Sequence, residues 1–203
     1  MRQTSALSLP ICWRIYMALC ALVALSSVAA AQEAPRKKRN LARADRAAWR
    51  EVLRWPETCE EDYESAYAGE EKYGGVEFHA LGRGLYLVEV VCDGGGIQPS
   101  AVFVLYDERR PRRARLLKLK GFDESDDAKR PARYSPVRAL TKFDARRREL
   151  SLMSKYDAMG TCGLFVRYRF VRGRPRVVEA REQVDCGGPE GTPDTDRWPR
   201  KRL

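Results

Sequence analysis

Four cysteines and one histidine are the residues of this chain best suited to redox, metal or acid–base chemistry. The cysteines are Cys59, Cys92, Cys162 and Cys186. They form no CxxC pair, and His79 is not spaced as a ligand to any of them, so the pattern does not predict a zinc site. No nucleophile or orienting carboxylate near His79 forms a catalytic triad. We therefore expect a solvent-facing histidine, no catalytic residue, no metal site and no cofactor.

The first 31 residues are typical of a secretory signal. Arg2 and Arg14 are their only charges, and an uncharged stretch at 15–28 follows. Ala29-Ala30-Ala31 before Gln32 is an A-x-A site of the kind that signal peptidase accepts. The apolar segment is short for a bilayer core of ~30 Å. We expect cleavage after Ala31, no membrane span in the mature chain, and a periplasmic or secreted location.

An even number of cysteines in an exported chain predicts a disulfide framework. Two further cysteines leave with the signal, and the remaining four allow three connectivities. The predicted hairpin loop at 172–175 places Cys162 nearly opposite Cys186, where a disulfide fits. Elimination then pairs Cys59 with Cys92. The same register places Arg169 opposite Glu179.

The chain is basic, with 38 Lys and Arg against 28 Asp and Glu and a formal net charge of +10. Such a balance favours anionic partners such as lipid head groups or envelope polymers. The densest group surrounds the predicted hairpin, and its candidate anion-binding residues are Arg167, Arg169, Arg172, Arg174 and Arg176. The same arginines also fit a solvated sheet face that blunts edge pairing, or an arginine-rich genome. Export argues against nucleic acid as a partner.

The start of the mature chain predicts a linker followed by a helix pair. Residues 32–44 are basic and poor in apolar side chains, so we expect a flexible linker. Asp45 is a suitable N-cap for a helix that Pro56 ends. Thr58, with a glutamate three residues later, predicts a capping box for a second helix that Gly69 closes.

The rest of the chain predicts strands and turns, which makes the fold mainly β (α+β), with a short helix pair followed by antiparallel meanders. The expected strands are 76–80, 85–92, 101–106, 114–120, 149–156, 164–171 and 176–184. We expect one domain at 45–187, with a mobile polar loop at 123–136, and a C-terminal tail at 188–203.

An internal similarity suggests that the meanders are two related three-stranded units. Phe165, Val166 and Tyr168 follow Phe103, Val104 and Tyr106 at an interval of 62 residues. A duplication explains this spacing, and so does chance in a β-rich sequence.

Several motifs resemble one known family. The segment 143–186 contains F-D-A-R-R-R-E-L-S-L, then G-T-C-G, an aromatic strand, R-V-V-E-A-R and a last cysteine. Trp55-Pro56 with Cys59-Glu60 precedes it, and Trp198-Pro199 follows it. This pattern resembles the exported bacterial family catalogued as domain of unknown function 1176, from which Thr161 departs where an acidic residue is common. The resemblance implies a periplasmic or secreted location and assigns no catalytic residue.

Two classes of function fit these observations. The first is a non-enzymatic module that binds an envelope component or another periplasmic protein through its β-sheet. The alternative is a small periplasmic hydrolase or a hydrolase inhibitor. A hydrolase needs converging carboxylates, with candidates Glu89, Asp93, Glu179 and Asp185. An inhibitor of lysozyme is expected to present acidic loops, which the basic charge of this chain disfavours.

Overall fold

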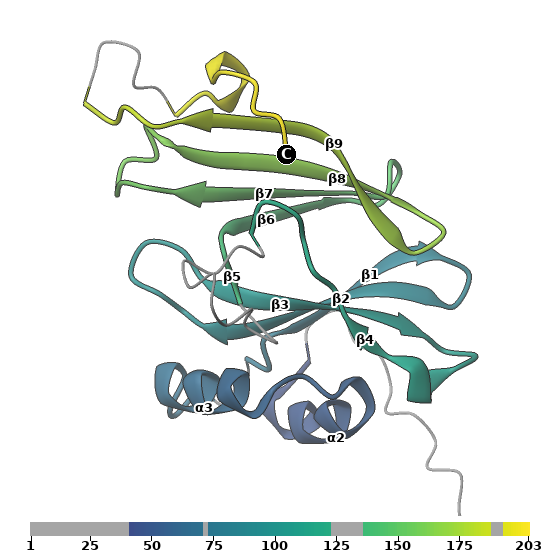
Figure 1. Cartoon of the computed structure of the whole chain (residues 1–203). Coiled ribbons are helices and arrows are strands. Elements are labelled where there is room, and N and C mark those ends of the chain that lie inside the picture. Colours follow the sequence, from purple (N-terminus) through teal and green to yellow (C-terminus); the bar gives the residue numbers. More distant parts are fainter. Residues whose placement is uncertain (1–40, 71–72, 123–135, 188–192) are drawn as a thin grey trace, which may run out of the picture. The chain divides into compact units, whose positions relative to one another are not determined.

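The computed structural model describes residues 41–70, 73–122, 136–187 and 193–203, all within the unit Ala34–Leu203 (Figure 1). The predicted signal segment lies outside the described residues, and so do positions 32–40 of the expected linker. The expected loop 123–136 also lies outside them, except for Pro136. None of the described helices is both long and apolar enough to cross a membrane.

Two short helices come first in the described chain. Helix α2 spans Arg43–Leu53, so the last two residues of the expected linker are helical. Helix α3 spans Glu57–Ala66 and follows Pro56, whose ring holds φ near the observed −59°. Both helices begin before the predicted N-caps, Asp45 and Thr58, and neither has a side-chain cap. Asp45 instead lies in the first turn, where the helix dipole favours a carboxylate.

Sheet A is antiparallel, and its first three strands form a meander. Its strands are β1 (Val76–Gly82), β2 (Leu85–Asp93), β3 (Ser100–Asp107), β4 (Arg115–Leu116) and β5 (Val137–Arg138). Strand β2 lies between β1 and β3, and β4 and β5 share the other side of β3. The expected strand 114–120 is shorter than predicted, because the chain leaves the sheet edge and buries Leu119 in the core.

Sheet B is an antiparallel meander in the order β6-β7-β8-β9. Its strands are β6 (Leu140–Asp144), β7 (Glu149–Lys155), β8 (Gly163–Val171) and β9 (Arg174–Gln183). Part of the expected tail packs beside β9: the 3₁₀ helix η3 spans Thr195–Arg197, Trp198 is buried, and Arg200 forms a β-bridge with Arg181.

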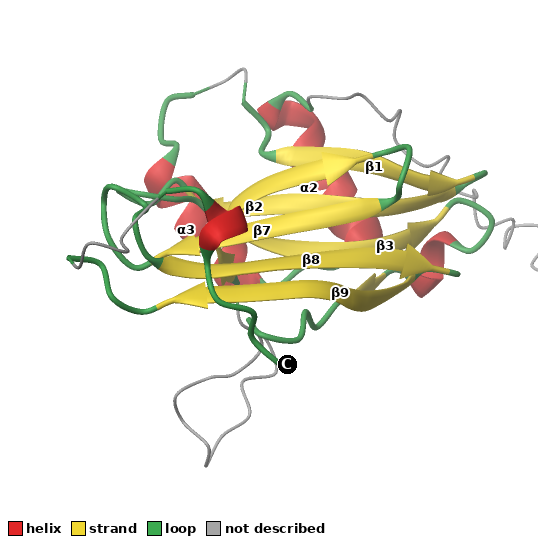
Figure 2. Ribbon diagram, turned by 90° about the horizontal axis from the view of Figure 1, so that it is seen from above, coloured by secondary structure: helices red, strands yellow, loops and turns green. Residues whose placement is uncertain are grey.

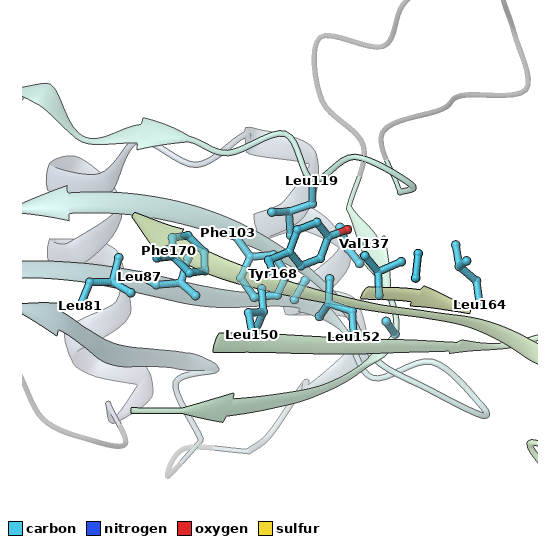
Figure 3. Packing of buried hydrophobic residues seen from close by; sticks show 14 residues of the cluster. Leu81, Leu87, Phe103, Leu119, Val137, Leu150, Leu152, Leu164, Tyr168 and Phe170 are labelled. Carbon is cyan, nitrogen blue, oxygen red and sulfur yellow. The ribbon is translucent and has the colours of Figure 1, made fainter. Parts of the chain in front are cut away.

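The elements form three layers, with sheet A between the helices and sheet B (Figure 1). Side chains alternate along β2, so Val88 and Val90 pack with Trp49 of α2 while Leu87 faces sheet B. Figure 3 shows the core between the sheets, whose labelled residues are Leu81, Leu87, Phe103, Leu119, Val137, Leu150, Leu152, Leu164, Tyr168 and Phe170. Sheet A is therefore covered on both faces.

The internal similarity has a counterpart in this layering. Val104 and Tyr106 of β3 pack against the helix layer, whereas Val166 and Tyr168 of β8 pack against sheet A. Both pairs therefore point in the same direction through the three layers, because each lies on the side of its sheet that is nearer the helices. A duplication remains a hypothesis that agrees with this orientation.

Two disulfides connect these elements, and both match the predicted pairs. Cys59 of α3 is bonded to Cys92 of β2 with a Cα–Cα distance of 4.5 Å. Cys162 and Cys186 are bonded with a Cα–Cα distance of 4.8 Å and tie the start of β8 to the segment after β9. Both distances fall in the range usual for disulfides. Such bonds point to an oxidising environment outside the cytoplasm.

Candidate anion-binding site

Alternate turns of an antiparallel meander lie at the same end of a sheet, which brings four turns of this protein together. They comprise residues 83–84, 108–114, 145–148 and 172–173. Within sheet A, the backbone N–H of Glu108 donates to the carbonyl of Gly84 at 2.9 Å. Between the sheets, Arg115 Nη2 donates to the carbonyl of Gly173 at 3.3 Å. We call these four turns the arginine end.

The arginine end has a one-sided charge. Its nine arginines are all exposed, and they are Arg83, Arg109, Arg110, Arg112, Arg113, Arg146, Arg147, Arg148 and Arg172. Glu108 is the one acidic residue within the four turns. The turns at the opposite end, 94–99 and 156–162, contain no lysine or arginine. Figure 2 shows the strands of both sheets running along one common direction, so the two sets of turns lie at opposite ends.

The β8–β9 hairpin places Arg172 in the arginine end, and Arg174 and Arg176, two more of the predicted anion-binding arginines, follow it on β9. Arg172 and Gly173 have φ values of 51° and 72°, as a two-residue type I′ turn requires. A Cβ on Gly173 would lie only 3.0 Å from Leu105 of β3, so the turn packs closely on sheet A. Arg172, Arg174 and Arg176 are exposed and form no ion pair within the part of the chain that the structure describes.

The other two predicted residues, Arg167 and Arg169, are ion-paired on the outer face of sheet B. Arg169 Nε and Nη2 donate to Glu149 Oε1 at 2.9 and 2.6 Å, and Glu149 is 4% exposed. Arg167 pairs with Glu179, which also accepts from Arg181 Nε at 2.7 Å. The Arg181 hydrogen bond, followed by the charge of Arg167, lowers the pKa of Glu179. These two arginines therefore connect strands and are less available to a ligand.

The expected pairing of Arg169 with Glu179 is wrong. The turn is centred between Arg172 and Gly173, one residue before the predicted centre, and a β-bulge follows Arg167. Arg169 accordingly lies opposite Arg176, and Glu179 lies opposite Arg167.

The four carboxylates considered for a hydrolase have separate partners. Glu89 contacts His79 at 3.2 Å, Asp93 binds Arg138 at 2.9 Å, Glu179 pairs with Arg167, and Asp185 accepts from the Gly187 N–H at 3.1 Å. The Gly95 backbone N–H, followed by Arg138, lowers the pKa of Asp93. The described residues thus contain no convergent set built from these four.

His79 is not solvent-facing, contrary to our expectation. Its side chain is 11% exposed and stacks on Phe143 with ring centroids 4.7 Å apart. The reason is that β1 is covered on both faces: Val76 packs against the helix layer, whereas Leu81 lies in the core between the sheets.

Comparison with known protein families gives one match. Residues 18–201 match the family described as Protein of unknown function (DUF1176). The chain belongs to this family. No curated protein and no solved structure matches the chain.

The DUF1176 motifs of this chain have structural roles. Trp55 Nε1 donates to Glu60 at 2.9 Å, and Glu60 also pairs with the buried Arg46 at 2.9 Å. In the G-T-C-G segment, a Cβ on Gly163 would lie 2.1 Å from the carbonyl oxygen of Ser154, so a side chain has no room there. These motifs hold α3 against α2 and sheet A and close the β7–β8 pairing.

Most of the arginine end was not predicted from the sequence. Only the hairpin arginines were predicted to bind an anion, because five arginines are close in sequence there. The turns 108–114 and 145–148 contribute seven more arginines, from other parts of the chain. The predicted meander could have shown that these turns lie together, since every second turn of a meander falls at the same end of the sheet.

Proposed function

We propose that this protein is a non-enzymatic exported module whose arginine end binds an anionic component of the bacterial envelope. The observation that carries the proposal is the contrast between the two ends of the sheets. Nine exposed arginines occupy the turns at one end, and none occupies the turns 94–99 and 156–162 at the other. A uniform compositional bias would supply arginines to both ends, so composition alone does not explain this distribution.

The chemistry of arginine supports an anionic ligand. A guanidinium presents a planar fork of donors that matches phosphate and carboxylate oxygens, and it stays charged at any physiological pH. Arg172, Arg174 and Arg176 have no ion-pair partner among the described residues, so a ligand need not displace an internal carboxylate. Phosphate of lipid head groups and carboxylate of wall polymers offer the same recognition chemistry.

The location of the protein supports an envelope ligand. The first 31 residues have the pattern of a cleaved signal, and the two disulfides suit a periplasmic or secreted protein. An exported protein meets anionic lipids and polymers rather than nucleic acid.

The test is retention on anionic surfaces by the triple variant R172E/R174E/R176E. Phosphatidylglycerol vesicles, phosphatidylcholine vesicles and peptidoglycan fragments distinguish a lipid from a wall polymer. We expect the wild-type protein to bind an anionic surface with an affinity that falls as salt rises. Each basic residue near an anionic membrane contributes about 1 kcal/mol, so loss of three should weaken binding by more than about 100-fold.

The matched control is R197E/R200E/R202E, which makes the same change in net charge at exposed positions of the C-terminal segment. This variant should retain most of the wild-type affinity. Equal losses in both variants would show that net charge alone drives binding, and absence of wild-type binding to every anionic surface would refute the proposal.

A further inference from the structure

Three side chains with metal-ligating atoms meet on the face of sheet A that is turned toward sheet B. Glu77 and His79 are two residues apart on β1 and therefore share a face. Glu89 of β2 lies directly opposite Glu77. His79 Nε2 is 3.2 Å from Glu89 Oε2, and its Nδ1 is 3.9 Å from Glu77 Oε1. One ligand atom from each residue can be chosen so that all three lie within 4.8 Å of one another.

These side chains line a cleft of about 480 Å³ along the β1 and β6 sides of the two sheets. Phe143 and Thr141 of β6 form the opposite wall. The Phe143 ring stacks on His79, which limits the rotation of the imidazole. The cleft gives the three ligand atoms access to solvent while their positions stay fixed by paired strands.

The two glutamates carry a charge that the described residues do not balance. Glu77 and Glu89 are a cross-strand pair of like charges, an arrangement that destabilises a sheet. The Glu89 side chain is only 12% exposed, and this burial raises the free-energy cost of its negative charge. Among the described residues, His79 is the one ion-pair partner of either glutamate, so at most one positive charge pairs with two carboxylates. A bound cation would remove this imbalance.

We propose that Glu77, His79 and Glu89 bind a divalent transition-metal ion of the Zn²⁺ type. One imidazole nitrogen and two carboxylates are ligands that Zn²⁺ accepts, at about 2.0–2.2 Å each. Tetrahedral binding at those lengths requires ligand atoms roughly 3.3–3.6 Å apart. The Nε2–Glu89 distance of 3.2 Å is close to this requirement. Glu77 contacts the other ring nitrogen, Nδ1, so its half-exposed side chain must rotate toward Nε2 for all three residues to bind one ion.

In tetrahedral geometry three protein ligands leave a fourth position, and the cleft beside these residues would give a small ligand access to it. Zinc sites with three ligands and an open position exchange water or small ligands there, whereas structural zinc sites have four protein ligands. The inference does not depend on the anion-binding proposal, because no arginine of the arginine end lines this cleft.

The other group of potential ligands carries no such inference. Asp157, Cys162 and Cys186 also lie close together, but the two cysteines are bonded to each other. Their sulfurs therefore supply no thiolate to a metal.

The experiment is titration of the purified, metal-stripped protein with ZnCl₂ alone, followed by calorimetry and thermal unfolding. The wild-type protein should bind one Zn²⁺ per chain, and its Tm should rise with the zinc concentration. Mg²⁺ should compete poorly, because it prefers oxygen ligands in octahedral geometry. Co²⁺ in place of Zn²⁺ should give a visible absorption spectrum typical of low coordination number.

The decisive variant is E77Q/E89Q, with H79Q as a second. We expect either to lower zinc affinity by more than the roughly 10–100-fold that loss of an outer-sphere partner causes. The metal-free E77Q/E89Q protein should melt at or above the wild-type Tm, because the substitution removes like-charge repulsion. Such a Tm would show that the variant is folded, so its lower zinc affinity would reflect the loss of the ligands.

The control E51Q/E61Q removes two exposed carboxylates from the helices and should leave zinc binding unchanged. Absence of saturable one-to-one binding by the wild-type protein would overturn the proposal. Equal binding by wild type and E77Q/E89Q would overturn it as well, since the zinc would then be bound elsewhere.

Discussion

At the scale of single residues, Arg46 contacts several elements of the fold, and no sequence motif indicated this role. It is fully buried on α2, and its Nη1 and Nη2 donate to the carbonyls of Gly74 at 2.8 Å and Val91 at 3.1 Å. Its Nε pairs with Glu60, and its guanidinium carbon lies 3.6 Å from the centre of the Tyr63 ring. Burial lowers the pKa of Arg46, and the Glu60 carboxylate opposes that change.

Replacing this arginine should be far more damaging than replacing its neighbour on the same helix. R46M removes the ion-pair partner of Glu60, which keeps its hydrogen bond from Trp55, and removes the donor to two carbonyls. Breaking one partner of a buried ion pair costs about 3–5 kcal/mol. R50M removes an exposed pair with Glu57, worth about 1 kcal/mol or less. Urea unfolding measures both free energies of unfolding. Similar losses for the two variants would contradict the structural role of Arg46.

Sequence patterns predicted the cysteine partners better than the burial of polar side chains. The disulfide pairs were predicted correctly because four cysteines allow few connectivities and the hairpin places Cys162 near Cys186, although the predicted register was one residue off. The environment of His79 did not follow, because alternation along β1 cannot show that sheet B covers the polar side of that strand. The buried Arg46 was missed because two of its acceptors are the backbone carbonyls of Gly74 and Val91, and no residue type in the sequence marks a backbone carbonyl as the partner of an arginine.

At the scale of elements, the disulfide Cys59–Cys92 joins the helix layer to the central strand of sheet A. Both cysteines are fully buried, whereas Cys186 of the second disulfide is exposed. The two disulfides span 33 and 24 residues, which on the loop-entropy model stabilises the fold by a similar amount, roughly 3.5 kcal/mol each.

Removing the fully buried disulfide Cys59–Cys92 should therefore cost more than removing Cys162–Cys186, of which only Cys162 is buried. C59A/C92A loses the loop-entropy contribution and also buried contacts between α3 and β2, whereas C162A/C186A loses mainly the former. Chemical denaturation should rank C59A/C92A as the less stable variant. The reverse ranking would mean that α3 contributes little to the packing of sheet A.

Most strands were predictable, and the exceptions have physical reasons. Strands β2, β3, β7 and β8 are long and rich in β-branched, aromatic or other apolar residues, so their pattern is clear. Strand β6 was not predicted, because its five residues include only two apolar ones, Leu140 and Phe143. The length of β4 depends on how β4 and β5 share one edge of β3. The local sequence pattern cannot show such an arrangement.

At the scale of the whole described domain, the distribution of charge follows from topology. Two meanders place four arginine-rich turns at one end, although these turns are spread from residue 83 to residue 173 in the chain. Exposed charges act over only ~8 Å at physiological ionic strength, so the grouping matters more than the net charge of +10. A ligand therefore meets this end as a single basic surface.

The most direct test of this account is a map of the binding surface by NMR, using backbone amide signals of the wild-type protein. Adding bicelles that contain phosphatidylglycerol should shift or broaden the signals of residues 83–84, 108–114, 145–148 and 172–176. Signals from turns 94–99 and 156–162 should stay unchanged, and high salt should reverse the effects. Changes centred on the opposite turns, or spread evenly over the domain, would contradict the assignment of the arginine end as the binding surface.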